Sequence, residues 1–255
     1  MTDEISRDVP PIVDHDSFAG LSAATSRREF LRVVGLGTTI ALLPGFAAAC
    51  GSDSVTGPSN EIAGSGEPLL IDFASGDAAI LQLASVVEQI AADFYSRAVA
   101  AFATSNVTAV EQAVLTEIRD HELAHRAFLD GTLGADASRT ATPTFRGVDF
   151  ADRVAVLTTA RTIEDLGVAT YNGAAQYLTS TDTLLAVAKI VSVEGRHSSA
   201  IGDLQEPKTA AFSPTASDDV WRPAKSAAAI QSYLVDKLAF ANLPTTFIQG
   251  PNGQG

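Results

Sequence analysis

The chain has 255 residues, of which 46% are hydrophobic and 18% are charged, so it can bury a core and lacks the composition of a disordered protein. Its 30 acidic side chains outnumber its 17 lysines and arginines, and the resulting net charge of −13 argues against nucleic acid as a partner. The single cysteine excludes a framework of intramolecular disulfides and any zinc module built from several cysteines.

Residues 1–50 have the features of an export signal. The run SRREFLR, which starts at Ser26, matches the twin-arginine consensus, and an apolar stretch over residues 33–49 follows it. That stretch is short for a membrane span and suits the hydrophobic region of a signal peptide. It ends in AAAC, which resembles a lipobox with Cys50 as the lipidated residue. Cleavage at an Ala-x-Ala site, with Cys50 unmodified, is the alternative.

We therefore expect a twin-arginine signal peptide that the twin-arginine export machinery recognises. The mature protein would lie in the periplasm or on the outer face of the cell membrane, anchored to the membrane by a lipid on Cys50. Residues 51–67 are rich in serine, glycine and proline, which predicts a flexible linker between the anchor and the folded domain. Twin-arginine export carries folded proteins, often with a cofactor already installed, so a metal or cofactor site is expected further along the chain.

Four long segments repeat apolar residues at three- and four-residue spacing, which predicts helices over residues 77–102, 109–130, 149–178 and 181–204. Thr108 and Glu111 form the pattern of a capping box at the start of the second helix. Short turns join the first helix to the second and the third to the fourth, whereas a polar segment of about 18 residues links the two pairs. This organisation predicts an all-α fold, an antiparallel four-helix bundle with one long crossover, over residues 68–206.

The remaining residues, 207–255, are predicted to form a C-terminal extension with one additional helix. Pro223 suits the first turn of that helix, which would run to about residue 241. No segment alternates apolar and polar residues convincingly enough to predict a strand.

Six ionisable side chains fall within the apolar stripes of the four predicted helices. They are Glu88, Glu122, His125, Glu164, Glu194 and His197. Burying several carboxylates in one small core is costly unless they have partners. At about 1.5 Å of rise per residue, the four glutamates lie roughly 21–27 Å from the turn of their own helix pair, so all six side chains can meet in one layer.

The composition of this layer suits two divalent cations. Four carboxylates carry a charge of −4, which two such ions balance while both imidazoles stay neutral and free to ligate. Ligands rich in carboxylates favour iron or manganese over structural zinc, which is typically held by thiolates and histidines. We therefore predict that two iron or manganese ions are the cofactor.

The two halves of the bundle resemble each other. Glu88 precedes Tyr95 by seven residues, as Glu164 precedes Tyr171, and a Glu-x-x-His motif occurs in the second helix of each pair. This indicates a duplicated helical hairpin with a pseudo-two-fold metal site between the copies. For both tyrosines, packing in the core with a satisfied hydroxyl is the main interpretation, and a redox role is the alternative.

These motifs resemble those of the ferritin-like superfamily of di-iron carboxylate proteins, in which two helices each give one glutamate and two others each give Glu-x-x-His. Within it, the chain is similar to the bacterial ferritin-like domain family related to plant desiccation-related proteins. The resemblance implies that Glu122 and Glu194 bridge the metals, that Glu88 and Glu164 are terminal or bridging ligands, and that each histidine binds one metal. The tyrosines would lie beside the ligands. The ligands this implies are Glu88, Glu122, Glu164, Glu194, His125 and His197.

Residues 121–125, HELAH, also match the His-Glu-x-x-His motif of zinc metalloproteases. That interpretation makes His121 and His125 the zinc ligands, but it leaves Glu88, Glu194 and His197 unexplained. In the bundle interpretation only His121 is left over. It lies about 100° around the helix from Glu122 and is expected at the rim of the site, beside the ligands.

Two classes of function fit such a site. An enzyme would use the metals to activate O₂ or peroxide, as a ferroxidase, a peroxidase or a catalase-like protein. A non-enzymatic protein of the cell envelope would instead bind metal or protect against stress or desiccation. The sequence favours oxidative chemistry slightly, and turnover of peroxide or ferrous iron would distinguish the two classes.

Overall fold

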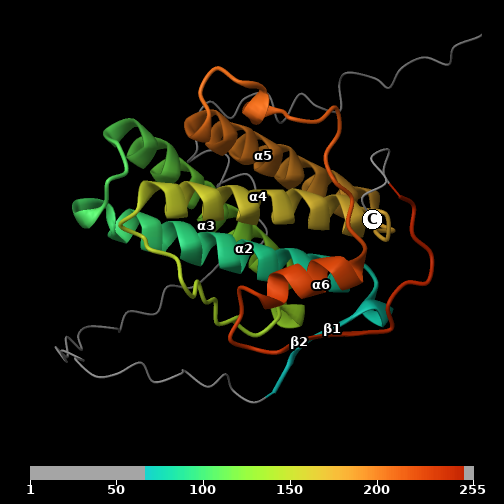
Figure 1. Cartoon of the computed structure of the whole chain (residues 1–255). Helices are drawn as coiled ribbons and strands as arrows, with labels where there is room; N and C mark the ends of the chain where they lie inside the picture. Colours follow the sequence, from blue (N-terminus) through green and yellow to red (C-terminus); the bar gives the residue numbers. More distant parts are fainter. Residues whose placement is uncertain (1–66, 250–255) are drawn as a thin grey trace, which may run out of the picture. The chain divides into compact units, whose positions relative to one another are not determined.

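In the computed structural model of the chain, residues 67–249 are described (Figure 1). The predicted signal peptide, the lipidation site Cys50 and the linker up to residue 66 lie outside the described residues, so the predictions of export and anchoring stay predictions. Among residues 67–249, no helix is both long enough and apolar enough to cross a membrane.

Four long helices form the predicted bundle. These are α2 (Asp77–Ala100), α3 (Ala109–Leu133), α4 (Arg153–Ala175) and α5 (Thr181–Gln205). Helix α2 contacts both α3 and α4, and α4 contacts α5, so two hairpins pack side by side through their first helices (Figure 1). The turns within the hairpins are short, and the long connection runs from α3 to α4, as expected for one crossover. The all-α bundle is therefore confirmed.

Side-chain caps fix where α3, α4 and α5 begin. The Thr108 hydroxyl accepts a hydrogen bond from the backbone N–H of Glu111, and the Glu111 carboxylate accepts one from the backbone N–H of Thr108, which is the predicted capping box. Helix α4 begins at Arg153, four residues later than predicted. Its cap is Asp152, whose carboxylate accepts a hydrogen bond from Ala155 N at 2.9 Å, so residues 149–151 belong to the preceding turn.

The C-terminal extension differs from its prediction. Its helix α6 (Pro223–Gln231) has nine residues and ends ten residues before the predicted boundary. Strand β2 (Leu238–Ala241) follows and pairs in parallel with β1 (Leu69–Asp72), which was also not predicted. The Gln231 side chain accepts a hydrogen bond from Leu238 N at 2.8 Å and thereby turns the chain from helix into strand.

An ion pair between the partly exposed Arg139 and the buried Asp236 holds this part of the extension against the crossover. Arg139 Nη1 lies 2.9 Å from Asp236 Oδ1, and Thr142 N donates to Asp236 Oδ2 at 2.6 Å. Because Asp236 needs these two partners when it is buried, the segment after α6 is drawn toward residues 139–142 and cannot continue as a helix. The predicted α-helix of the extension is thus present and begins at Pro223 as expected, but its predicted end near residue 241 is wrong.

The extension also packs closely on helix α4. Trp221 N donates a hydrogen bond to the carbonyl oxygen of Ala169 at 3.0 Å. A Cβ atom added to Gly173 would lie 1.8 Å from the carbonyl oxygen of Trp221, so only glycine permits this approach. Partly as a result, most residues of α2 and α4 are buried, whereas α3 and α5 each bury one stripe of residues.

Candidate metal centre

All six predicted ligands meet in the middle of the bundle. Helix α2 gives Glu88, α3 gives Glu122 and His125, α4 gives Glu164, and α5 gives Glu194 and His197. The four glutamates and His197 are buried, and the side chain of His125 is 14% exposed. Their ligating atoms form two groups, and within each group all atoms lie within 4.8 Å of one another.

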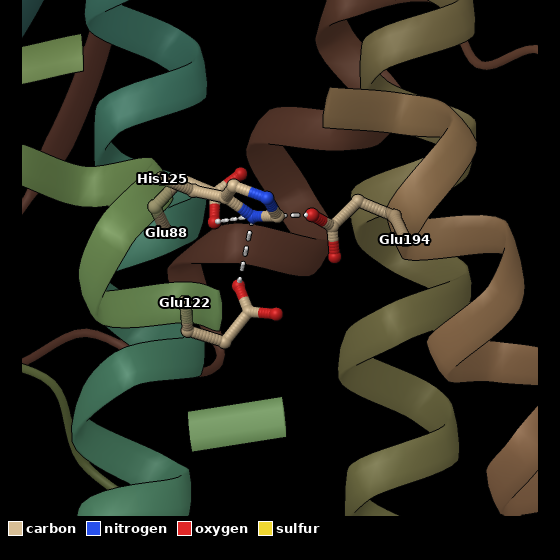
Figure 2. Close-up of side chains that lie close together, drawn as sticks. All are labelled: Glu88, Glu122, His125 and Glu194. Carbon is tan, nitrogen blue, oxygen red and sulfur yellow. Dashed lines mark ion pairs between the residues drawn. The ribbon is translucent and has the colours of Figure 1, made fainter. Parts of the chain in front are cut away.

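The first ligand group consists of Glu88, Glu122, His125 and Glu194. Within it, Nδ1 of His125 lies 2.8 Å from Glu194 Oε1, 3.6 Å from Glu88 Oε2 and 3.9 Å from Glu122 Oε2 (Figure 2). Figure 2 shows Glu88 and Glu194 approaching from helices other than α3, which carries both Glu122 and His125, with the three carboxylates on different sides of the imidazole nitrogen.

The second ligand group consists of Glu122, Glu164, Glu194 and His197. Here Nδ1 of His197 lies 2.9 Å from Glu122 Oε1, 3.4 Å from Glu194 Oε2 and 3.5 Å from Glu164 Oε2. Glu122 and Glu194 therefore belong to both groups and present a different oxygen to each histidine. Each of these two carboxylates therefore has one oxygen available to a cation in either group.

The other two glutamates each present one oxygen to their group, because a tyrosine occupies the second oxygen. Tyr171 donates a hydrogen bond to Glu88 Oε1, and Tyr95 donates one to Glu164 Oε1. Each tyrosine thus bonds the glutamate of the opposite hairpin and not the one seven residues before it. Both hydroxyls have a partner, as the core-packing interpretation requires.

The facing atoms of the two groups are buried without hydrogen bonds. The atoms in question are Glu88 Oε2, both oxygens of Glu122, His125 Nδ1, Glu194 Oε1 and His197 Nδ1. They lie within ion-pair distance of one another but point at common centres, so they do not form regular pairwise hydrogen bonds. Buried polar atoms almost always have a partner, and a cation at each centre would provide one. The residues present therefore fit a pair of bound metal ions.

The electrostatics of the cluster also favour positive charge at its centre. Burial acts to lower the pKa of His125 and His197, but the surrounding carboxylates outweigh it and raise the pKa of each imidazole to about 12. Burial and the neighbouring carboxylates raise the pKa of Glu122 well above its ordinary value, and burial raises that of Glu164 to about 7. Burial also acts to raise the pKa of Glu194, but hydrogen bonds with His125 and His197 outweigh it and lower that pKa to about 2. Carboxylates packed this closely around the two imidazoles favour positive charge there, and they would attract metal cations for the same reason.

The two tyrosines remain hydrogen-bond donors at neutral pH. Burial, together with the negative charge of Glu164 beside Tyr95 and of Glu88 beside Tyr171, raises the pKa of both phenols well above 10.0. Neither hydroxyl is therefore ionised, and each can only donate its proton to the adjacent carboxylate.

His121 belongs to neither ligand group. Its Nδ1 lies 2.9 Å from Nε2 of His197, the nitrogen that faces away from the second group, and its side chain is 41% exposed. This is the predicted place at the rim of the site. The zinc-protease interpretation requires His121 and His125 to converge on one ion, and the structure directs His121 to His197 instead. Glu117, one turn before His121, also lies nearby and was missed by sequence reasoning.

Comparison with known proteins gives one result on the family. A search for similar characterised proteins finds no match. The family model of the ferritin-like domain matches residues 76–207, which is just over half of the chain and spans all four bundle helices with the six converging side chains. With the fold and the buried carboxylate–histidine cluster in agreement, the chain belongs to the ferritin-like domain family.

Proposed function

We propose that this protein binds two iron or manganese ions, one in each ligand group. Glu122 and Glu194 would bridge the ions, Glu88 and His125 would complete the first site, and Glu164 and His197 the second. The observation that carries this proposal is the division of the oxygens of Glu122 and Glu194 between two histidines that face different centres. A cluster that only satisfied buried charges would have no need for this symmetry.

We further propose that the bound pair takes part in the oxidation of ferrous iron or in the reduction or disproportionation of peroxide. Ions of this kind supply one-electron chemistry toward O₂ and peroxide. The chain would contribute the ligands, their orientation and the exclusion of bulk water. His125 is the most exposed of the six side chains, so small molecules would reach the site from its side.

The place of action follows from the sequence alone. We infer from the twin-arginine motif and from Cys50 that the protein is exported through the twin-arginine machinery and held at the membrane by a lipid. We also propose that the chain is one of the ferritin-like lipoproteins related to desiccation-related proteins, which would agree with a role in the cell envelope. Metal loading would then take place in the cytoplasm, before the folded protein is exported.

Elemental analysis tests the metal site directly. The full chain, folded in the cytoplasm, should carry two iron or manganese ions, and Glu122→Ala should carry none, because this residue contributes to both sites. Glu206→Ala is the matched control, since it removes an exposed carboxylate at the end of α5. Absence of bound transition metal in the unaltered chain, or two tightly held ions in Glu122→Ala, would refute the proposal.

A second measurement decides between the two classes of function. The metal-loaded chain is mixed with ferrous iron and O₂, or with hydrogen peroxide, and consumption is followed over many equivalents. Continued turnover that Glu122→Ala lacks would establish oxidative chemistry. Stoichiometric binding without turnover would instead support a protein that binds metal in the envelope without catalysis.

A further inference from the structure

The two ligand groups differ in what lies behind their histidines. In the first hairpin the residue before the Glu-x-x-His motif is His121, whereas the corresponding residue of the second hairpin is Val193. The ring of His121 lies nearly coplanar with that of His197, at an interplanar angle of 11°, with its Nδ1 2.9 Å from Nε2 of His197. Valine has no side-chain atom that accepts a hydrogen bond, so His125 cannot receive the same support from α5.

This contact constrains where the protons of His197 lie. A cation in the second ligand group needs the lone pair of His197 Nδ1, so the imidazole proton must be on Nε2. That N–H points at Nδ1 of His121, which then accepts the bond and carries its own proton on Nε2. The Nε2 atom of His121 in turn lies 3.5 Å from Glu117 Oε1. All three groups are then satisfied by one arrangement of protons.

Histidines that bind metals generally donate their second N–H to a carboxylate or carbonyl, which fixes the ring and makes the ligating nitrogen more basic. In this protein an imidazole stands between the ligand and the carboxylate. The side chains of His121 and Glu117 are both more than 40% exposed, so they add little to the packing of the bundle. Their geometry toward His197 therefore calls for an explanation other than stability.

We propose that His121 is a positioning residue that holds the Nδ1 lone pair of His197 toward the second ligand group, so that this group binds its ion more tightly than the first. The inference rests on the proposed function, because it presupposes an ion in each group. It adds that the two sites are unequal although their ligands are equivalent, and that the inequality comes from one residue outside the ligand set.

Titration of the metal-free full chain with Co²⁺ under anaerobic conditions, followed by calorimetry, tests this inference. We expect two binding steps, and His121→Leu should weaken the tighter step by about 10- to 100-fold while it leaves the weaker step unchanged. His121→Asn should restore most of the affinity, because its amide oxygen can accept the bond from His197. Asp120→Asn, an exposed change beside His121, should alter neither step.

Proton NMR of the Co²⁺-loaded chain gives a readout that a purely structural role would not affect. In the unaltered chain, the N–H proton of His197 should give a shifted resonance because it exchanges slowly with water. In His121→Leu this resonance should broaden because exchange is faster, and in His121→Asn the sharp resonance should return. The N–H of His125 is the internal reference. If His121→Leu binds both ions as the unaltered chain does and keeps slow exchange, the inference is wrong although the metal site stands. If the unaltered chain does not take up two ions, both proposals fail.

Discussion

The two hairpins of the bundle supply the same ligands but present different outer surfaces. The residue nine positions after Glu88 is Arg97 in the first hairpin, and the residue nine positions after Glu164 is Gly173 in the second. Arg97 lies at the surface, paired with Asp93 and placed over the ring of Phe145. Gly173 instead lies under the backbone of Trp221, where the C-terminal extension crosses α4. The carboxylate–histidine cluster thus requires the two hairpins to be equivalent only on the faces that carry its six side chains, the inner faces. The opposite, outer faces are free to differ.

The largest expected effect is on metal binding by the inner faces. In each hairpin, loss of the glutamate proposed to bridge the ions should cost more bound metal than loss of the glutamate proposed as a terminal ligand. Glu194→Ala should abolish binding of both ions, as Glu122→Ala does, because each residue faces both histidines. Glu88→Ala and Glu164→Ala should each leave one ion bound. In each of these four variants, the affinity for the lost ion should fall by more than the roughly 10- to 100-fold that is typical when a residue hydrogen-bonded to a ligand is removed. Metal content per chain and calorimetric titration measure the difference.

Measurements on the metal-free variants show whether a variant loses metal because it lacks a ligand or because it no longer folds. In the metal-free chain Glu194 is an ion-pair partner of His125 and His197, which lower its pKa to about 2 although burial opposes ionisation. Glu194→Ala should therefore lose stability even without metal. Circular dichroism and thermal unfolding of the metal-free variants show which of them are still folded when their metal content is measured. If Glu88→Ala lost both ions while folded, or Glu194→Ala kept one, the assignment of bridging and terminal roles would be wrong.

Sequence periodicity was sufficient to predict the inner faces. The apolar stripes of the four helices are interrupted by Glu88 and Glu122 and by the corresponding glutamates of the second hairpin, which indicates that these charges are buried together. The distances from the turns place them at one depth in the bundle. Sequence periodicity could not predict that Tyr95 bonds Glu164. In the sequence Tyr95 is nearest to Glu88, seven residues earlier on the same helix, and no pattern indicates a partner on a neighbouring helix. Which way a helix is rotated against its neighbour depends on packing that no single stripe specifies.

The outer faces were less predictable for a different reason. Strands β1 and β2 pair over a separation of about 170 residues, and each has only four residues, too few for alternation to be recognised. The end of α6 depends on the burial of Asp236 beside Arg139, a long-range contact that outweighs local helix propensity. His121 was placed at the rim by its angle around the helix, but its bond to His197 comes from α5 and needed the structure.

The next largest effect is on stability, and it arises where the outer face of the second hairpin packs against the C-terminal extension. Gly173→Ala should destabilise the fold by about 1–3 kcal/mol, because the new Cβ would lie 1.8 Å from the carbonyl oxygen of Trp221 and would force the extension away from α4. Urea denaturation of the metal-free chain measures the change. Metal stoichiometry should not change, since the clash lies outside the cluster.

Gly195→Ala is the matched control on α5, where an added Cβ would meet no atom within 4 Å beyond its chain neighbours and the adjacent backbone of its own helix. This substitution should stabilise the helix by about 0.5–1 kcal/mol, the usual gain when alanine replaces glycine in a helix interior. Equal destabilisation by both substitutions would mean that Trp221 does not pack against Gly173 as described.

A smaller effect should again be equal in the two hairpins. Tyr95→Phe and Tyr171→Phe each remove a hydrogen bond to the opposite glutamate, leaving one oxygen of Glu164 or Glu88 free to turn toward the ion or away from it. We expect about 1 kcal/mol of lost stability and a drop of about tenfold in affinity for one ion, with similar values for both. Tyr177→Phe, whose hydroxyl bonds the carbonyl of Thr246, is the control and should leave metal affinity unchanged. An effect confined to one tyrosine would break the pseudo-two-fold relation.

The smallest effect concerns the ion pair that ties the extension to the crossover. Burial opposes ionisation of Asp236, but its hydrogen bonds with Arg139 and Thr142 prevail and lower its pKa. A carboxyl whose pKa is lower in the folded state stabilises the fold above its unfolded pKa of about 3.9, and this contribution is lost as the pH falls through the folded value. Asp236→Asn should therefore cost about 1 kcal/mol at pH 7, because Arg139 is partly exposed, and less at strongly acidic pH. Urea denaturation between pH 2 and pH 7 measures this convergence, with the exposed Asp218→Asn as control; parallel curves for Asp236→Asn and the unaltered chain would show that the ion pair does not secure the extension.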